Sequence, residues 1–304
     1  MSVLVTGARG ALGSQVTRLL TERGTTVYGT QRPGSGTRGA PDMRWLDCDL
    51  SKADEVRAAV ATSKPSSVVH AAGLGGTHDL ARLIEANVIA LSHLLSALAD
   101  TELDRMVVVG SGAEYAAPDG ETPIREDHPL APTNPYGLSK LFQFELSRMA
   151  VRAGTPLVYA RPFNMIGPGV SDATAVGDIT RRLARTLESG GDTLEVGDLD
   201  RSRDYVDVRD AAAACVTLLE RGEAGGVYNV CSGVSTLLKD VVDRLLAIGG
   251  NKVATRQVEH HPSISFQVGD GSRLRALGWA PAYDLDTSLR DGLESELRVI
   301  ENSG

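Results

Sequence analysis

Cysteine and aromatic residues are scarce in this chain. The three cysteines among 304 residues, Cys48, Cys215 and Cys231, lie far apart and form no CxxC pair. A structural zinc site and a disulfide framework are therefore not expected, and a reducing cytoplasm fits this usage. Aromatics make up only 4% of the chain, so Val, Leu and Ala must fill the core that a hydrophobic content of 42% allows.

Positive charge and long apolar runs are also limited. The net charge of −8 argues against a broad nucleic-acid or anionic-membrane surface, although it is compatible with a local basic pocket for a phosphate ester. No window approaches the length of a transmembrane helix, and the start "MSVLVTGARGALG" has no features of a signal peptide. The histidines show no metal-ligand spacing. We therefore expect a cytoplasmic protein with no metal, nucleic-acid or membrane partner.

Strand-like and helical segments alternate through the first two-thirds of the chain. This rhythm predicts an α/β fold, a Rossmann-type doubly wound parallel sheet with helices on both faces. After about residue 165 the rhythm weakens, so we expect a dinucleotide-binding domain over 1–165 and a smaller, partly interleaved substrate lobe over 166–304. Strands are predicted at 2–6, 25–30, 43–48, 66–72, 104–111, 156–161, 194–196 and 226–230, and helices at 11–24, 52–63, 78–100, 136–154, 177–190, 208–221 and 236–248.

A glycine-rich loop lies between the first strand and the first helix. "TGARGALG" spaces Gly7, Gly10 and Gly13 as GxxGxxG. Glycines there permit a tight turn and close backbone approach, and the helix N-terminus offers free N–H groups to a pyrophosphate. The alternative is a purely structural turn. The other residues predicted to contact a dinucleotide are Ala11 and Leu12 in the loop, Asp49 and Leu50 after the third strand, and Ala71, Ala72 and Gly73 after the fourth.

The residues at the end of the second strand indicate which cofactor is bound. An acidic residue there would hydrogen-bond a ribose 2′-hydroxyl, but the chain has Thr30, Gln31 and Arg32, with Arg9 inside the glycine loop. Two guanidiniums would suit a 2′-phosphate. We therefore expect NADP(H) over NAD(H), with NAD(H) as the alternative if Arg32 is only a solvated loop residue.

"NPYGLSK" (134–140) places a phenol and an ammonium four residues apart on one predicted helix. Tyr136 and Lys140 then share a helix face. An ammonium beside a phenol favours the phenolate and so lowers the phenol's pKa, which makes a general acid/base. Ser111 ends a predicted strand at the sheet edge where ligands bind, and could hold a carbonyl oxygen. A chance Tyr/Lys spacing is the alternative.

These motifs together resemble the extended short-chain dehydrogenases/reductases, the NAD-dependent epimerase/dehydratase superfamily. "TGARGALG", "GSGAEY" and "PYGLSK" look like its dinucleotide, serine and Tyr/Lys motifs, and the resemblance continues in "RPFNMIGPG" (161–169), "RSRDYVDVRDAA" (201–212), "YNVCSG" (228–233) and "LGWAP" (277–281). The resemblance implies a catalytic Ser111, Tyr136 and Lys140 and a nucleotide-diphosphate sugar as substrate. It also implies that Asn164 and Arg203 contact this substrate, Arg203 at the pyrophosphate. Arg182 and Arg209 are further candidates, unless they are solvated helix residues.

The residues after Ser111 separate the branches of this family. Sugar-nucleotide 4,6-dehydratases carry an Asp–Glu pair there, whereas this chain has Gly112 and Ala113, which cannot transfer protons. Glu114 is one place further on and is expected to point elsewhere. The motifs are most similar to those of the GDP-4-keto-6-deoxy-mannose reductases, although Ala113 replaces a common acidic residue. The alternatives are an epimerase with tightly bound NAD and a non-catalytic dinucleotide-binding protein on the same fold.

Two predicted helices are apolar on more than one side, which calls for a second packing partner. Family members often dimerise through a four-helix bundle of these helices, so we expect a homodimer; burial beneath the C-terminal lobe is the alternative. The apolar residues concerned are Leu80, Ile84, Val88, Leu91 and Leu95 in one helix, and Leu141, Phe142, Phe144 and Leu146 in the other.

Overall fold

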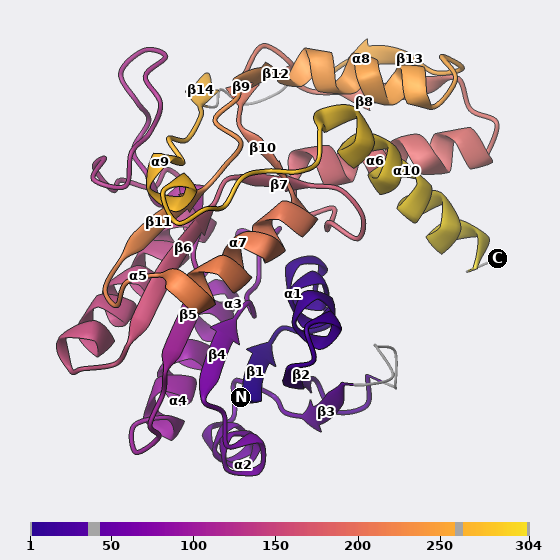
Figure 1. Ribbon diagram of the computed structural model, residues 1–304. Helices are drawn as coiled ribbons and strands as arrows, with labels where there is room; N and C mark the ends of the chain where they lie inside the picture. The colour runs from indigo at the N-terminus through magenta and orange to yellow at the C-terminus, as the bar shows by residue number, and fades with distance from the viewer. Residues whose placement is uncertain (1, 36–42, 259–263, 303–304) are drawn as a thin grey trace.

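A seven-stranded parallel sheet runs through the larger part of the molecule, in the order β11-β6-β5-β4-β1-β2-β3 (Figure 1). The structure is a computed structural model that describes residues 2–35, 43–258 and 264–302. The strands are β1 (Ser2–Thr6), β2 (Thr26–Gln31), β3 (Arg44–Asp47), β4 (Ser67–His70), β5 (Arg105–Val109), β6 (Leu157–Pro162) and β11 (Val227–Val230). The predicted fold class, a Rossmann-type doubly wound sheet, is confirmed.

Helices cover both faces of the sheet, and this explains why its central strands, such as β1 and β5, are mostly apolar. In β1, Val3 and Val5 pack into one core cluster, whereas Leu4 packs into the cluster on the opposite face. Burial on both faces is what selects continuous runs of Val, Leu and Met in parallel strands. One face carries α1 (Ala11–Glu22) and α7 (Val208–Arg221), and the other carries α2 (Ala53–Ser63), α4 (Ala90–Ala97) and α5 (Pro135–Arg152).

A second lobe lies beyond the carboxyl ends of the strands and has its own apolar core (Figure 1). Its helices α6 and α10 pack on each other and on α8, and Leu183, Val242 and Leu289 are nearly inaccessible to solvent. Its helices are α6 (Ala175–Glu188), α8 (Leu238–Ile248) and α10 (Leu285–Glu301), and its strands are β7 (Asn164–Ile166), β8 (Thr193–Val196), β9 (Ser202–Arg203), β10 (Tyr205–Asp207), β12 (Thr236–Leu237), β13 (Ala254–Gln257) and β14 (Phe266–Gln267). The short helix α9 (Ser272–Arg275) packs on β11 of the main sheet instead.

Between β10 and β12 of this lobe, the chain returns to the main sheet and forms α7 and β11 there. β11 pairs with β6 in the seven-stranded sheet, and α7 packs against α1. The predicted helix 208–221 and strand 226–230 therefore lie in the layers of the main sheet although they follow residue 165. The described residues leave out 36–42 and 259–263, so the histidines His260 and His261 lie outside them.

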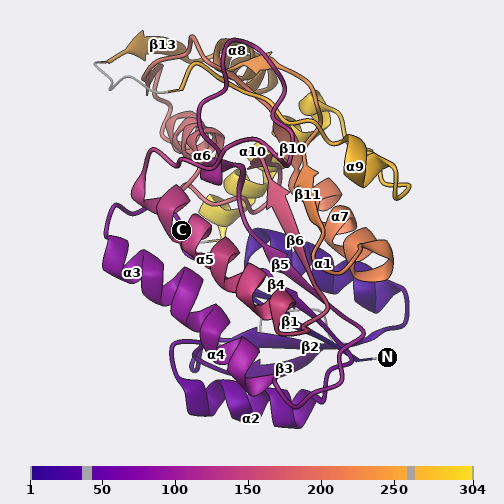
Figure 2. The ribbon, with the colours of Figure 1, turned by 90° about the vertical axis from the view of Figure 1, so that its left-hand side faces the viewer.

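The predicted helix 78–100 consists of three pieces. α3 (Leu80–Ile84) continues into a π-helical turn (Glu85–Ile89) and then α4, and it lies beside α5 in Figure 2. The segment Leu80–Ala97 is long and apolar enough, by length and composition alone, to cross a membrane, so the expectation that no segment reaches that length is wrong. In this fold it packs on α2 and α5, with 28% of the segment buried.

Candidate active site

Two neighbouring cavities lie at the carboxyl edge of the sheet. The first has a volume of about 710 Å³ and is lined by the glycine loop and by the ends of β2, β3 and β4. The second, of about 1000 Å³, lies between the sheet and the second lobe. Gly10, Ala71, Gly73 and Leu74 line both cavities, so a single extended ligand could occupy the two. Such volumes suit an organic ligand of cofactor size.

The glycine loop is shaped for close approach by backbone and ligand. Gly7 has a φ of +69°, and a Cβ on it would lie 2.7 Å from the Ala72 Cα. A Cβ on Gly13 would lie 2.1 Å from the Gly7 main-chain oxygen. Side chains are therefore excluded where α1 begins and its free N–H groups face the cavities. The donor set fits a pyrophosphate.

Every residue predicted to bind the cofactor lines one of these cavities. The first cavity is lined by Gly7, Arg9, Gly10, Arg32, Asp49, Leu50, Ala71, Ala72 and Gly73. The second adds Ala11, Leu12, Gly13, Tyr136 and Lys140, and also contains Ser111 and Asn164. Residues from segments as far apart in the chain as Gly7 and Asn164 thus meet at one edge of the sheet. Their individual roles in binding stay predictions.

Ser111 begins a short 3₁₀ turn (Gly112–Glu114) directly beyond β5. Its hydroxyl accepts a hydrogen bond from the Ala113 N–H at 3.1 Å and also pairs with the Tyr136 phenol. The start of α5 packs tightly on this turn, because a Cβ on Gly137 would lie 2.3 Å from the Ala113 main-chain oxygen. Asn134 caps α5 by accepting from the Gly137 N–H at 2.8 Å. This cap and contact bring the two hydroxyls together.

Lys140 is buried beside Tyr136, with 4% of its surface exposed. Its ammonium donates to the Val109 main-chain oxygen and to Gln143 Oε1, both at 3.0 Å. Burial lowers the pKa of Lys140 to about 8. Burial raises the pKa of Tyr136 above its ordinary value, against the lowering effect of the Ser111 hydrogen bond. The expectation that the lysine lowers the phenol's pKa is therefore wrong for this structure, because desolvation of the phenolate dominates.

Asn87, on the π-helical turn, is a site residue that the sequence reasoning missed. Its side chain is fully buried, accepts from the Leu74 N–H at 2.8 Å, and donates to the Leu74 oxygen at 3.0 Å and to Ser139 Oγ at 2.9 Å. Ser139 in turn donates to the Tyr136 main-chain oxygen at 2.7 Å. Asn87 therefore joins a loop that lines both cavities to the helix of Tyr136. A lone asparagine within the apolar run "EANVIALSHLL" was the available signal.

Glu114 does not face the cavity. It is fully buried and pairs with Arg161 at 2.7 Å, on the side of the turn away from the site. Gly112 and Ala113 line the second cavity in its place. The described lining therefore has no carboxylate beside Ser111 that could perform the proton transfers of 4,6-dehydration.

The three predicted substrate arginines lie outside the cavity lining among the described residues. Arg182 pairs with Asp178, and Arg209 pairs with Asp207 and Asp291 while it stacks on Tyr283. Arg203 donates to two main-chain oxygens, those of Ser202 at 2.9 Å and Ile264 at 2.6 Å. Their contacts with a substrate stay predictions.

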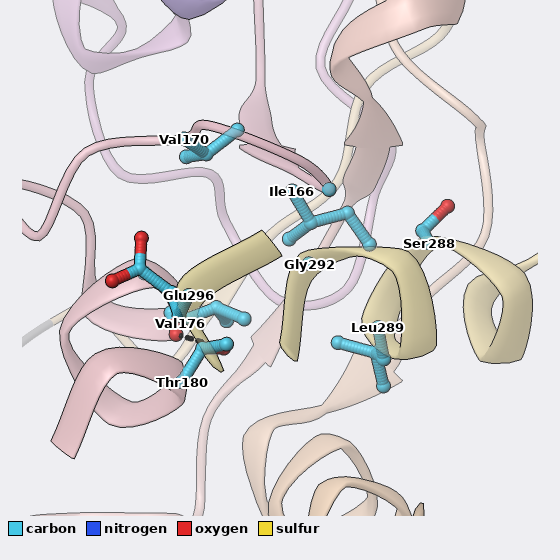
Figure 3. Close-up of a pocket in the computed structure, with 10 residues that line it drawn as sticks. Ile166, Val170, Val176, Thr180, Ser288, Leu289, Gly292 and Glu296 are labelled. Carbon is cyan, nitrogen blue, oxygen red and sulfur yellow. Dashed lines mark hydrogen bonds between the residues drawn. The ribbon is translucent and has the colours of Figure 1, made fainter. Parts of the chain in front are cut away.

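A third, much smaller cavity lies between the loop after β7 and the helices α6 and α10 (Figure 3), and Val170 lines both this cavity and the second one. It holds about 10 Å³, roughly the space of one water. Ile166 and Val170 face Val176, Thr180, Leu289 and Glu296 across it, so α10 and α6 support the loop that leads to the site. A sugar or a nucleotide cannot fit there.

Comparison with known proteins gives the family. The model of the NAD dependent epimerase/dehydratase family matches residues 3–231. GDP-6-deoxy-D-mannose reductase of Pseudomonas aeruginosa is 34% identical over 250 residues, which cover 78% of this chain and 82% of the reductase. UDP-glucose 4-epimerase of Azospirillum brasilense is 30% identical over an aligned region that covers 99% of this chain and 93% of the epimerase. The chain belongs to the NAD-dependent epimerase/dehydratase family of extended short-chain dehydrogenases/reductases.

Solved structures agree with this placement. RMD from Pseudomonas aeruginosa, complexed with NADPH, superposes with a TM-score of 0.83 at 30% identity, covering 98% of this chain and 99% of that one. UDP-glucose 4-epimerase of Thermus thermophilus, complexed with NAD, gives 0.87 at 26% identity, covering 97% and 99%. The resemblance seen in the motifs is confirmed, and so is the enzyme class: an NAD(P)-dependent enzyme of the oxidoreductase or epimerase type.

Proposed function

We propose that this enzyme uses NADPH to reduce a nucleotide-linked 4-keto-6-deoxyhexose to the 4-hydroxy sugar. The observation that carries the proposal is the hydrogen-bonded pair of Ser111 and Tyr136, next to Lys140, in a cavity that continues into the glycine-loop cavity. Two of the proteins named above, the GDP-6-deoxy-D-mannose reductase and the RMD structure complexed with NADPH, support this choice.

Each residue of the site then has a defined task. Bound NADPH supplies a hydride. Tyr136 gives its proton to the oxygen of the reduced carbonyl, and Ser111 hydrogen-bonds that oxygen so that the developing charge is stabilised. The raised pKa of Tyr136 keeps its phenol protonated near neutral pH, as a proton donor requires. Lys140 orients the cofactor ribose and adds a positive charge below pH 8.

The cofactor preference for NADP(H) rests on two guanidiniums. Arg9 and Arg32 line the same cavity, beyond the end of β2. Arg9 lies over the Trp45 ring and donates to Gln31 Oε1 at 3.1 Å, so its position is defined. A 2′-phosphate between them would receive charge-assisted hydrogen bonds. The glycine-loop cavity would bind the dinucleotide whether the enzyme prefers NADP(H) or NAD(H).

Arg203 is the best candidate for the substrate diphosphate. Its hydrogen-bond partners among the described residues are neutral carbonyl groups. Burial and the neighbouring charge of Arg201 lower its pKa, so an anion bound there would offset an unfavourable environment. Arg182 and Arg209 already have carboxylate partners, which makes a role in substrate binding less favourable for them.

A homodimer is the proposed assembly, formed by α3–α4 and α5 from two subunits. Leu80, Ile89, Phe142 and Met149 are 38–63% exposed on these adjacent helices. Leu91 and Phe144, which were predicted for the same apolar faces, pack in the sheet core instead. Because the four exposed residues are not covered by the C-terminal lobe, a second copy is the occupant that their apolar surface calls for.

The second candidate function is epimerisation with retained NAD. It is favoured by the 30% identity to a UDP-glucose 4-epimerase across almost the whole chain. One experiment separates the two functions: purified protein is supplied with NADPH and a panel of GDP-, dTDP-, CDP- and UDP-linked 4-keto-6-deoxy sugars. Reduction consumes one NADPH per sugar. An epimerase consumes none, and its purified form carries the absorbance of bound cofactor.

A further inference from the structure

A buried carboxylate lies directly beneath the catalytic residues. Glu114 Oε1 accepts from the Ser111 N–H at 2.8 Å, and the Tyr159 hydroxyl lies 3.0 Å from the same oxygen. Glu114 and Tyr159 are at most 2% exposed. A single carboxylate oxygen therefore holds the turn that presents Ser111.

The Tyr159 hydroxyl also reaches the helix of Tyr136. It lies 3.2 Å from the Lys140 main-chain oxygen, so its proton is shared between that oxygen and Glu114. The fit is tight, because a Cβ on Gly110 would lie 2.2 Å from the Tyr159 ring and 2.5 Å from Glu114 Oε1. Ser111 on one element and Lys140 on another are thus linked through two side chains that line neither cavity.

Arg161 balances the charge of this carboxylate. Its Nε donates to Glu114 Oε2 at 2.7 Å, and its guanidinium lies over the Phe144 ring at 4.2 Å. A buried ion pair of this kind is weak evidence for stability, since apolar replacements of similar volume are often as stable. Its place under the site favours a role in the reaction.

We propose that Glu114 and Tyr159 are positioning residues, which hold Ser111 and Lys140 at the spacing that proton transfer by Tyr136 requires. The proposal rests on the proposed function. The Glu114 charge also raises the pKa of both Tyr136 and Lys140, so the pair sets the electrostatics of the site as well as its geometry. Among the described residues, Arg161 and Tyr115 also lie beside Glu114, while Glu126 acts on Tyr115 and the Lys140 charge acts on His70.

A matched pair of substitutions tests the geometry. Tyr159 and Tyr115 are both almost fully buried and both pack on Arg161, but the Tyr115 hydroxyl bonds to Asn229 and Arg161 instead of Glu114 and Lys140. We expect Tyr159→Phe to lower kcat roughly tenfold with KM for NADPH unchanged. Tyr115→Phe keeps the wild-type kcat. Equal kcat values in the two variants would overturn the proposal.

The effect of the Glu114 charge on the Tyr136 pKa can be tested by a titration that does not require enzyme turnover. In the Glu114→Gln variant, we expect the Tyr136 phenol to ionise at a lower pH than in the wild type. The measurement is tyrosinate absorbance as a function of pH. The absorbance of the matching protein that also carries Tyr136→Phe is subtracted, so that the difference reports Tyr136 alone. Should Arg161 left unpaired prevent folding, the double variant Glu114→Gln/Arg161→Met removes both buried charges. An unmoved Tyr136 titration in a folded variant refutes the electrostatic role. Absence of wild-type turnover with every keto sugar would refute the reductase function alone.

Discussion

The Lys140 ammonium lies 3.0 Å from the main-chain oxygen of Val109, the last residue of β5. The helix that carries Tyr136 is therefore fastened to the strand that leads into Ser111. Residues from two elements then face one cavity at a spacing that neither element could set alone.

Tyr136→Phe removes the proposed proton donor. Because general acid catalysis contributes about 10²–10⁴-fold, we expect kcat to fall within that range while NADPH binding is retained. Steady-state turnover and a fluorescence titration with NADPH measure the two effects. Tyr28→Phe is the control, since Tyr28 is bonded to Arg44 and lines neither cavity. Near-normal turnover in Tyr136→Phe would dismiss the assignment.

Arg32→Ala should reduce the preference for NADPH. Loss of a charged hydrogen bond to a 2′-phosphate predicts a rise in KM for NADPH of roughly tenfold and little change for NADH. The ratio of kcat/KM for the two cofactors is the measurement. Arg23→Ala is the matched control, because Arg23 pairs with Glu220 outside both cavities. A wild-type enzyme that prefers NADH would contradict the NADP(H) proposal.

Folding stability should depend on the buried His70. Burial, assisted by the Lys140 charge, lowers the pKa of His70 to about 3. Below its ordinary pKa of about 6.5 the unfolded chain takes up a proton that the folded chain excludes. His70 therefore makes the free energy of unfolding fall by up to about 1.4 kcal/mol per pH unit between these values as the pH is lowered.

Denaturant unfolding at a series of pH values measures this slope. His70→Asn should flatten it, whereas His78→Asn, a change at an exposed histidine, should leave it as in the wild type. Equal slopes in the wild type and His70→Asn would show that other groups cause the acid sensitivity.

Phe142→Glu/Met149→Glu should disrupt the proposed homodimer. Each subunit would bring two carboxylates into the interface, where they would be buried without partners, and their desolvation is costly. Light scattering is expected to show a dimer for the wild type and a monomer for the double variant. Val299→Glu, at an exposed apolar residue of α10, is the control. A wild-type monomer would contradict the proposal, and binding of the monomer to lipid vesicles would assign the apolar helices to a membrane surface instead.

Local pattern predicted the seven strands of the main sheet and the positions of the site residues along the chain, but it did not predict α10 or most of the short strands of the second lobe. Alternation of apolar runs with amphipathic segments determined the parallel sheet, and a parallel sheet collects the carboxyl ends of its strands at one edge. The sequence alone therefore predicts that Gly7, Ser111 and Tyr136 lie close together.

Tertiary structure alone decided the environment of those residues. Whether a phenol's pKa rises or falls depends on burial and on charges from distant segments, here Glu114, whose partner Arg161 is 47 residues away. The bonds from Asn87 to Leu74 and Ser139 cross 13 and 52 residues. Sequence spacing determines which groups share an element, whereas desolvation and hydrogen bonding arise only when separate elements pack.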